Sequence, residues 1–299
     1  QCSVVIDLIY GLPGQTMEVW EQDLADLVSS GVDGADLYQL NVFDGSDLNK
    51  DIAKGKVPAA ATTAMQGDMF EFGRKYLDER SYRRLSAAHW STNNRERSLY
   101  NILAKAGVPM FPFGSGAGGN VDGYGMMLHR ALKPYEDMVS RGEKPFMALM
   151  KQSELQPIVN QVVSQLEQGF LNIMSLVKMD PRLGELNWLY RLWEERGLVA
   201  YNGLLYKLTA AGEFWTVNLT QSTLEAVEYI MTGKNSFAME AVAAQDTKTT
   251  SKDNPNQEVR GIGQGKANIS VPTDEDSEAQ RKEALIAKAK AEIAKSGAS

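Results

Sequence analysis

The chain opens with a short apolar run that ends in a turn containing glycine and proline. Residues 4–10 are mostly apolar, and residues 12–15 read Leu-Pro-Gly-Gln. A run of this length before such a turn is typical of a buried strand of a parallel sheet. Apolar residues at helical spacing follow, so we predict a helix that Thr16 caps and Gly31 ends. A second apolar run at residues 35–43 completes a predicted right-handed β-α-β unit.

Helical and strand patterns alternate from there to about residue 130. The polar segment at residues 44–61 is predicted to be a loop or a short helix. The predicted helices are residues 62–80 and 95–106, the predicted strands are residues 82–90 and 110–113, and residues 114–119 form a glycine-rich run.

Beyond residue 130 the pattern is mainly helical. Helices are predicted at residues 135–142, 151–177, 187–196 and 209–231, with a hairpin at residues 197–208 around Asn202-Gly203. This order resembles a winged helix. The last helices carry few basic residues, so we expect a structural role for it and not DNA binding.

The C-terminal tail has a different composition. After Phe237, the last aromatic residue, the chain is rich in Lys, Glu, Asp, Gln, Ser and Ala. Such a segment buries too little apolar surface to offset its ordering entropy. We predict disorder over residues 240–276 and an isolated charged helix over residues 277–296.

Composition and charge narrow the class of protein. The 299 residues carry a net charge of −7, so no basic nucleic-acid-binding surface is expected. No apolar run is long enough for a membrane span. The single cysteine, Cys2, is interpreted as a small apolar residue and is compatible with a reducing, cytoplasmic location. Because Gln1 stands almost at the start of a sheet strand, we expect residues upstream to be missing.

Three segments place polar or glycine residues at the carboxyl ends of predicted strands, where α/β sheets bind ligands. In the first, Asp7 lies within an apolar strand, so it either contacts a ligand or is tied to a neighbouring group. The second is residues 41–44. The third, residues 114–120, either approaches a flat ligand closely or needs positive φ values. His89 could face a cavity, although a lone histidine is more often a satisfied core residue.

Several other chemistries have no motif in the chain. His89 and His129 are the two histidines, and no Cys/His cluster has metal-ligand spacing. Residues 114–119 lack the P-loop pattern, and no G-x-S-x-G elbow occurs. No catalytic residue is assigned.

Several runs of the sequence resemble one known family. The segment at residues 6–16 (IDLIYGLPGQT), followed by Trp20 and Asp23-Leu24, resembles the signature after the fifth barrel strand of oxygen-independent coproporphyrinogen III oxidase-like proteins. These are radical S-adenosylmethionine (radical SAM) proteins. Further runs resemble the branch of anaerobic haem-degrading methyltransferases, the anaerobilin synthases. These runs are residues 36–43, 88–90, 94–97 and 113–119. The resemblance covers residues 3–235.

The resemblance implies an α/β fold in which residues 1–128 are the last strands of a partial (βα)6 radical SAM barrel and its extension. Residues 129–236 would be the helical, winged-helix-like C-terminal domain, and residues 237–299 a disordered tail. The CxxxCxxC motif that binds the [4Fe–4S] cluster is absent and would lie upstream, so the chain alone is expected to be inactive.

For the complete enzyme, the resemblance implies SAM and a [4Fe–4S] cluster as cofactors, haem or a porphyrin as substrate, and a reductant such as flavodoxin or ferredoxin. A methyl group from SAM would be transferred to haem, the macrocycle would open, and iron would be released. The implied cofactor-binding residues are Asp7, Ile9, Phe43 and Gly118, with weaker support for Gln15 and Asn41. His89 is the candidate for substrate binding. The alternatives are a coproporphyrinogen III dehydrogenase and a haem chaperone without catalysis.

Overall fold

The computed structural model describes residues 2–234, which form two compact units. The described part of the first unit is residues 2–84, 88–96 and 232–234, and the second unit is Leu85–Ala87 and Arg97–Met231. Residue 128, where a domain boundary is predicted, lies inside the second unit. The predicted disorder and helix of the tail lie outside the described residues.

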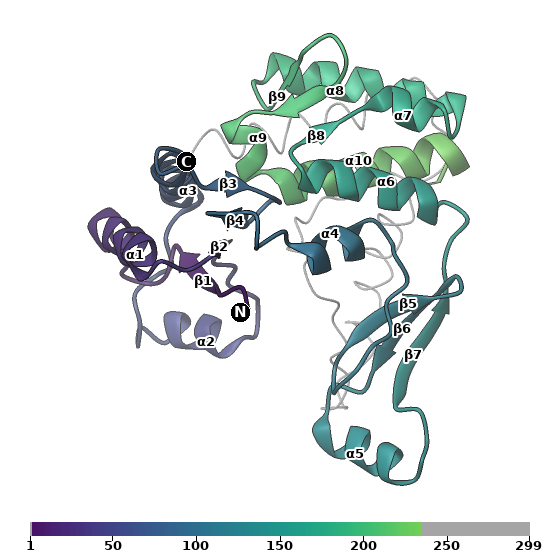
Figure 1. Ribbon diagram of the computed structural model, residues 1–299, viewed down its shortest axis with the longest axis horizontal. Helices are drawn as coiled ribbons and strands as arrows, with labels where there is room; N and C mark the ends of the chain where they lie inside the picture. Colours follow the sequence, from purple (N-terminus) through teal and green to yellow (C-terminus); the bar gives the residue numbers. More distant parts are fainter. Residues whose placement is uncertain (1, 235–299) are drawn as a thin grey trace. The chain divides into compact units, whose positions relative to one another are not determined.

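A four-stranded sheet forms the centre of the first unit (Figure 1). Its strands are β1 (Val5–Tyr10), β2 (Gly34–Gln39), β3 (Arg83–Arg84) and β4 (His89–Ser91), in the order β1-β2-β4-β3. β1 and β2 are parallel, as the predicted β-α-β unit requires, and β4 is antiparallel to both β2 and β3. The architecture is therefore mixed α/β.

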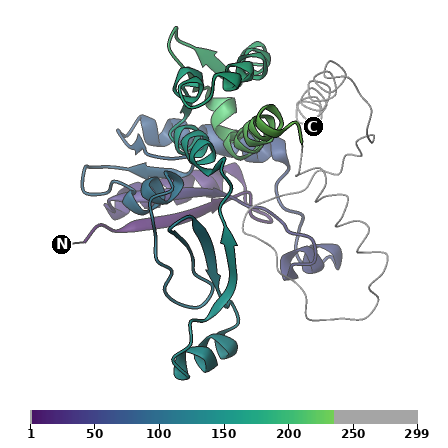
Figure 2. The ribbon, with the colours of Figure 1, turned by 90° about the vertical axis from the view of Figure 1, so that its right-hand side faces the viewer.

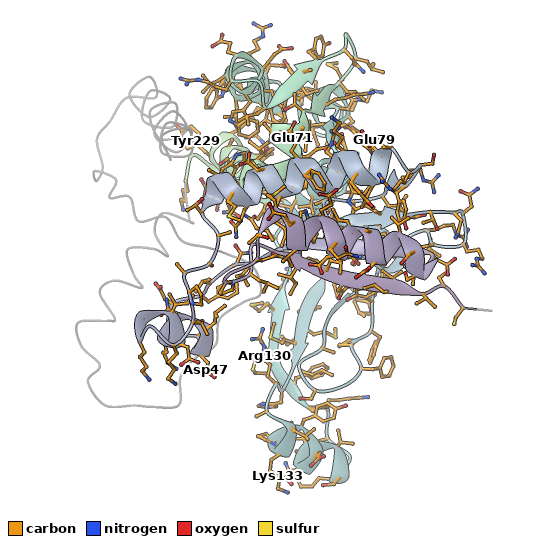
Figure 3. The ribbon with its side chains drawn as sticks, turned by 90° about the vertical axis from the view of Figure 1, so that its left-hand side faces the viewer. Asp47, Glu71, Glu79, Arg130, Lys133 and Tyr229 are labelled. Carbon is orange, nitrogen blue, oxygen red and sulfur yellow. The ribbon has the colours of Figure 1, made fainter. Side chains whose placement is uncertain are left out.

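Two long helices cover one face of this sheet. They are α1 (Met17–Ser30) and α3 (Thr63–Asp78), which lie side by side in Figure 3, whereas the short α2 (Asp47–Ala53) lies apart from them. The predicted ends of α1 are confirmed. The Thr16 hydroxyl accepts a hydrogen bond from Val19 N at 3.3 Å, and Gly31 ends the helix with a left-handed φ of 67°.

Trp20 on α1 is at the centre of the apolar layer between the helices and the sheet. It is fully buried, and its Nε1 donates a hydrogen bond to Met69 O on α3 at 2.8 Å. The Tyr10 ring of β1 lies 5.6 Å from the Trp20 ring. A Cβ atom at Gly73 would come within 3.1 Å of Trp20, so glycine lets α3 pack this closely.

A buried glutamine on α3 joins the ends of the two parallel strands. Gln66 Nε2 donates to Leu40 O at 3.0 Å, and Gln66 Oε1 accepts from Gln39 Nε2 at 2.8 Å. The same side chain packs against Gly11, where a Cβ atom would lie 2.6 Å from Gln66 Nε2. Gly11 also has a φ of 88°, which favours glycine. Gln66 therefore fixes the loops after β1 and β2 against α3.

Two predicted strands of the first unit are wrong in extent. The strand predicted at residues 35–43 ends at Gln39. The strand predicted at residues 82–90 is two short antiparallel strands, β3 and β4, because the chain turns back between them to pair the two. The apolar pattern alone does not mark this reversal.

The second unit contains two three-stranded antiparallel sheets, seven α-helices and one 3-10 helix among its described residues. One sheet consists of β5 (Gly118–Val121), β6 (Tyr124–Leu128) and β7 (Phe146–Lys151). Figures 1 and 2 show this sheet extending away from the helices of the same unit, with α5 (Leu132–Ser140) at its far end.

The sequence-based prediction missed the sheet of β5, β6 and β7. Asp122 and Gly123 form its two-residue turn with φ values of 50° and 77°, the pair of positive φ angles typical of a type I′ hairpin. The strand predicted at residues 110–113 is a single bridge between Met110 and Asn120. The predicted helix at residues 151–177 is also wrong, because Gly169, with a φ of 84°, interrupts it.

The remaining elements of the second unit surround a second apolar core. They are α4 (Leu99–Lys105), α6 (Gln156–Glu167), β8 (Phe170–Leu171), α7 (Ile173–Val177), the 3-10 helix Pro181–Glu185, α8 (Leu186–Glu195), β9 (Val199–Tyr201), β10 (Tyr206–Leu208), α9 (Ala210–Phe214) and α10 (Thr216–Thr232). The hairpin predicted around Asn202-Gly203 is present as β9 and β10. The Tyr190 hydroxyl is buried 2.9 Å from the Thr223 hydroxyl and links α8 to α10.

We predict that Gln66→Met lowers the free energy of unfolding by about 1–3 kcal/mol, the usual cost of leaving buried polar partners unsatisfied. Methionine keeps the length of the side chain but removes both amide hydrogen bonds. Gln22→Met, on the exposed face of α1, is the matched control and should change stability by less than about 0.5 kcal/mol. Urea unfolding of both variants checks this prediction, and equal losses in the two would contradict it.

Candidate functional site

The register between β1 and β2 determines which side chains of the two strands share each face of the sheet. Leu8 pairs with Leu37, and these positions share the face of Tyr10, which packs against the Trp20 and Phe70 rings of α1 and α3. Because side chains alternate along a strand, the residues between them point to the opposite face. That face carries the register pairs Asp7–Asp36 and Ile9–Tyr38. We call these four residues the strand face.

The strand face combines acceptors with apolar surface. Asp7 is exposed, while Ile9 and Tyr38 are 43% and 42% exposed. Burial of its ring raises the pKa of Tyr38, and the negative charges of Asp36 and Asp7 and a hydrogen bond with Asp36 raise it further. The Tyr38 phenol therefore stays protonated and interacts with the Asp36 carboxylate.

Asp36 is a functional candidate that the sequence-based prediction missed. The signal was available, since Asp36 is an acid within an apolar strand, as is Asp7. Tyr38 follows two residues later and so lies on the same face. These two residues, together with Asp7 and Ile9, are the candidates that the structure brings together.

The loop residues predicted to bind the cofactor have different surroundings. Gln15 Oε1 accepts hydrogen bonds from Gly11 N and Leu12 N at 2.7 and 3.1 Å, so its side chain is used to hold the turn after β1. Asn41 and Phe43 are exposed in the loop after β2, and Phe43 is 55% exposed.

Gly118, the other candidate, does not lie with these residues in the first unit. It belongs to the second unit, in strand β5 opposite Met127. The neighbouring Gly119 explains part of the glycine-rich run, because a Cβ atom there would lie 2.4 Å from Met110 O. Close backbone packing therefore requires at least one of these glycines.

His89 is not an open cavity residue, as its predicted role in substrate binding would require. Its side chain is 4% exposed. Nδ1 lies 3.0 Å from Asp36 Oδ2, and Nε2 lies 3.4 Å from Glu96 Oε1 without the geometry of a regular hydrogen bond. Both ring nitrogens thus face carboxylates, and this arrangement provides no direct contact with a substrate.

The balance of burial and charge favours the protonated His89 ring. Burial opposes the charged form, but the hydrogen bond with Asp36 and the negative charges of Asp36 and Glu96 outweigh it and raise the pKa of His89 above 6.5. We call His89, Asp36 and Glu96 the histidine cluster.

A second buried acid anchors the loop that carries Glu96. Asp33 accepts hydrogen bonds from Val4 N at 3.0 Å and Asn93 Nδ2 at 2.8 Å, and it pairs with Arg95. Hydrogen bonds from Asn93 and Val4, together with Arg95, hold the pKa of Asp33 below its ordinary value. The loop after β4 is thereby tied to the start of β2.

The described residues contain no group of three or more His, Cys, Asp or Glu side chains that could hold a metal ion. Cys2 is exposed and is the single cysteine of the sequence. Residues 1–299 therefore cannot by themselves supply a three-cysteine cluster site. Within residues 2–234, no helix is long and apolar enough to cross a membrane.

Comparison with known proteins shows which proteins this chain is similar to. No protein-family profile matches the chain. The chain is 35% identical over 231 residues to anaerobilin synthase of Escherichia coli O157:H7, which covers 77% of this chain and 51% of that protein. It is also 30% identical over 118 residues to radical S-adenosyl methionine domain-containing protein 1, mitochondrial, of Danio rerio, covering 39% of this chain and 26% of that protein.

The chain is therefore similar in sequence to radical SAM proteins over most of its length. Among solved structures, the radical SAM enzyme coproporphyrinogen III oxidase of Escherichia coli has a similar fold, with a TM-score of 0.57 and 17% identity. The match covers 73% of this chain and 54% of that one. The chain thus spans about half the length of the anaerobilin synthase and of the oxidase that it matches.

We predict that the histidine cluster stabilises the fold most at low pH. A histidine with a raised folded pKa contributes stability that is complete below its unfolded value of 6.5 and is lost as pH rises through the folded pKa. The difference in unfolding free energy between wild type and His89→Gln should therefore shrink from about pH 6 to about pH 9. Urea unfolding across this range measures it.

Glu96→Gln serves as the comparison, because it removes one of the two carboxylates that raise the His89 pKa. In this variant the loss of stability should begin at a lower pH. A difference between wild type and His89→Gln that stays constant or grows with pH would contradict the prediction.

Proposed function

We propose that the strand face binds the SAM cofactor of a radical SAM enzyme that degrades haem without oxygen. In the complete enzyme a methyl group from SAM would be transferred to the porphyrin, the ring would open and iron would be released. The similarity to anaerobilin synthase over 231 residues supports the substrate class. In this proposal β1 and β2 are the last parallel strands of a partial (βα)6 barrel, followed by a helical, winged-helix-like domain.

The observation that carries the proposal is the chemistry of the strand face. Asp7 offers carboxylate oxygens that accept hydrogen bonds from hydroxyl or ammonium groups. Ile9 offers an exposed apolar side chain beside them, and Tyr38 adds an aromatic ring. A nucleoside with a cationic side chain, such as SAM, presents hydrogen-bond donors, positive charge and a flat base, which suit this combination.

The loops after β1 and β2 complete the proposed cofactor site. Phe43 provides an exposed aromatic ring, and Asn41 an exposed amide, in the loop that follows β2. Gln15 would act by holding the turn after β1 in place. Gly118 remains a proposal for the second SAM or substrate region.

Bound SAM supplies a carbon-centred radical when a reduced [4Fe–4S] cluster cleaves it. The residues of this chain do not fit that cluster, because one cysteine cannot provide its ligands, so the chain alone is proposed to be inactive. The proposal includes a reductant such as flavodoxin or ferredoxin, because radical SAM chemistry needs an electron donor. It also includes a cytoplasmic location.

Asp7→Asn should weaken SAM binding by about tenfold or more, because it removes charge-assisted hydrogen bonds from the strand face. Isothermal titration of SAM into the 299-residue chain measures the dissociation constant. Glu71→Gln is the matched control, since Glu71 is an exposed acid on the helix α3 (Figure 3) and should leave SAM affinity unchanged. Equal affinities of wild type and Asp7→Asn would remove Asp7 from the site.

The full-length protein, reconstituted with iron and sulfide, should convert haem to a methylated linear tetrapyrrole when incubated anaerobically with SAM and a reductant. Mass spectrometry identifies the product, and an incubation without SAM is the control. In a parallel incubation with coproporphyrinogen III in place of haem, oxidative decarboxylation of its propionate side chains would indicate a dehydrogenase. Haem that is bound and recovered unchanged would indicate a chaperone.

A further inference from the structure

A buried imidazole between two carboxylates lies beside the strand face, because His89 on β4 is paired in register with Asp36 on β2. The carboxylates of Asp36 and Glu96 are 11% and 16% exposed, and His89 lies between them at 3.0 and 3.4 Å. Such a cluster contributes little net stability to a fold, because the free energy lost when the charges leave water offsets most of their mutual attraction. A role in positioning one of these three side chains would explain why buried charges are present here despite their desolvation cost.

The loop after β4 is built to hold Glu96 against His89. The Ser91 hydroxyl lies 3.3 Å from Glu96 O and 2.6 Å from Asn93 O. Asn93 in turn donates to the buried Asp33 at the start of β2. Each contact ties the loop to β2 or β4, so the position of Glu96 depends on the same sheet that carries the strand face.

Asp36 is the member of the histidine cluster that also belongs to the strand face. It is paired in register with Asp7, so two carboxylates stand on neighbouring strands and repel each other. Tyr38 stands two residues along β2 and therefore on the same face as Asp36. A cation on the opposite side of Asp36 would offset the repulsion and draw its carboxylate away from Asp7.

The charged and titratable groups facing the His89 ring come from two elements. β2 contributes Asp36, and the loop after β4 contributes Glu96. The nearby Asp33 pairs with Arg95, and its hydrogen bonds are directed to that loop and to Val4. The two carboxylates of the cluster thus determine the charge of the ring.

We propose that His89 is a positioning residue of the strand face: as an imidazolium between Asp36 and Glu96, it fixes the Asp36 carboxylate against the Tyr38 hydroxyl. The Tyr38 hydroxyl then donates to Asp36 and keeps its oxygen lone pairs for the ligand, while Asp7 remains available as a second acceptor. This inference rests on the proposed function, since SAM is the ligand that the strand face would hold. It assigns His89 an indirect role in place of substrate contact.

The experiment uses the 299-residue chain with 15N-labelled histidine and 13C-labelled tyrosine. The sequence has two histidines, so His129→Gln assigns the His89 signals, and Tyr38→Phe assigns Tyr38. The NMR signals of the His89 nitrogens and the Tyr38 ring are followed from about pH 5.5 to pH 9, together with the SAM dissociation constant. Tyr76, which lies on α3 beneath the Arg80 guanidinium, is the tyrosine control.

We expect both His89 nitrogens to be protonated at neutral pH, and the Tyr38 signal to follow the His89 titration while Tyr76 does not. SAM affinity should fall as the ring loses its proton, with the midpoint at a lower pH in Glu96→Gln. At neutral pH, His89→Gln should weaken SAM binding by about tenfold, the effect of losing one charge-assisted hydrogen bond, and His129→Gln should not.

A neutral His89 ring at pH 7, a Tyr38 signal independent of His89, or unchanged SAM affinity in a folded His89→Gln variant would overturn the positioning role. If the Tyr38 NMR signal follows the His89 titration but the wild-type chain binds no SAM, the proposed function fails and the positioning of Asp36 and Tyr38 stands. Circular dichroism of each variant establishes whether it is folded. If His89→Gln does not fold, the shift of the SAM-affinity midpoint in Glu96→Gln tests the proposal instead.

Discussion

The register of β1 on β2 is the constraint on which the site depends. Leu8 and Leu37 pair on the face that α1 and α3 cover, so Asp7 and Asp36 must pair on the other. A shift of one residue in either strand would turn one acid toward the apolar layer around Trp20. Burial of Trp20 thus selects the register that exposes Asp7 and Ile9. Alternate side chains of β1 and β2 therefore form the core on one face of the sheet and the candidate site on the other.

Each buried aspartate near this sheet has partners that offset the free-energy cost of burying its charge. Asp36 faces the His89 imidazole, and Asp33 is bound by Asn93, Arg95 and a backbone amide. Asp7 has no such arrangement among the contacts that the structure shows, and it is exposed. The contrast gives Asp33 a structural role, leaves Asp36 held by His89, and leaves Asp7 suited to a ligand. It also explains why acids within apolar strands need not share one function.

Local patterns are sufficient to predict β1, α1 and β2, although β2 ends earlier than predicted. The turn and cap around Thr16 and the end of α1 at Gly31 depend on neighbouring residues, and they were predicted correctly. β3 and β4 are short, and β4 forms by pairing with the distant β2, so periodicity does not reveal them. The Asp122-Gly123 turn was a readable hairpin signal that the prediction overlooked. The partners of His89 lie 53 and 7 residues away in sequence, at Asp36 and Glu96, and no spacing rule identifies them.

A crystal structure of the chain with bound SAM tests the central claim, that the face of β1 and β2 away from α1 and α3 is a cofactor surface. The account predicts electron density for SAM against Asp7, Ile9 and Tyr38, with the Asp36 carboxylate still in contact with the His89 ring. Density for SAM bound elsewhere, with the strand face in contact with solvent, would contradict it.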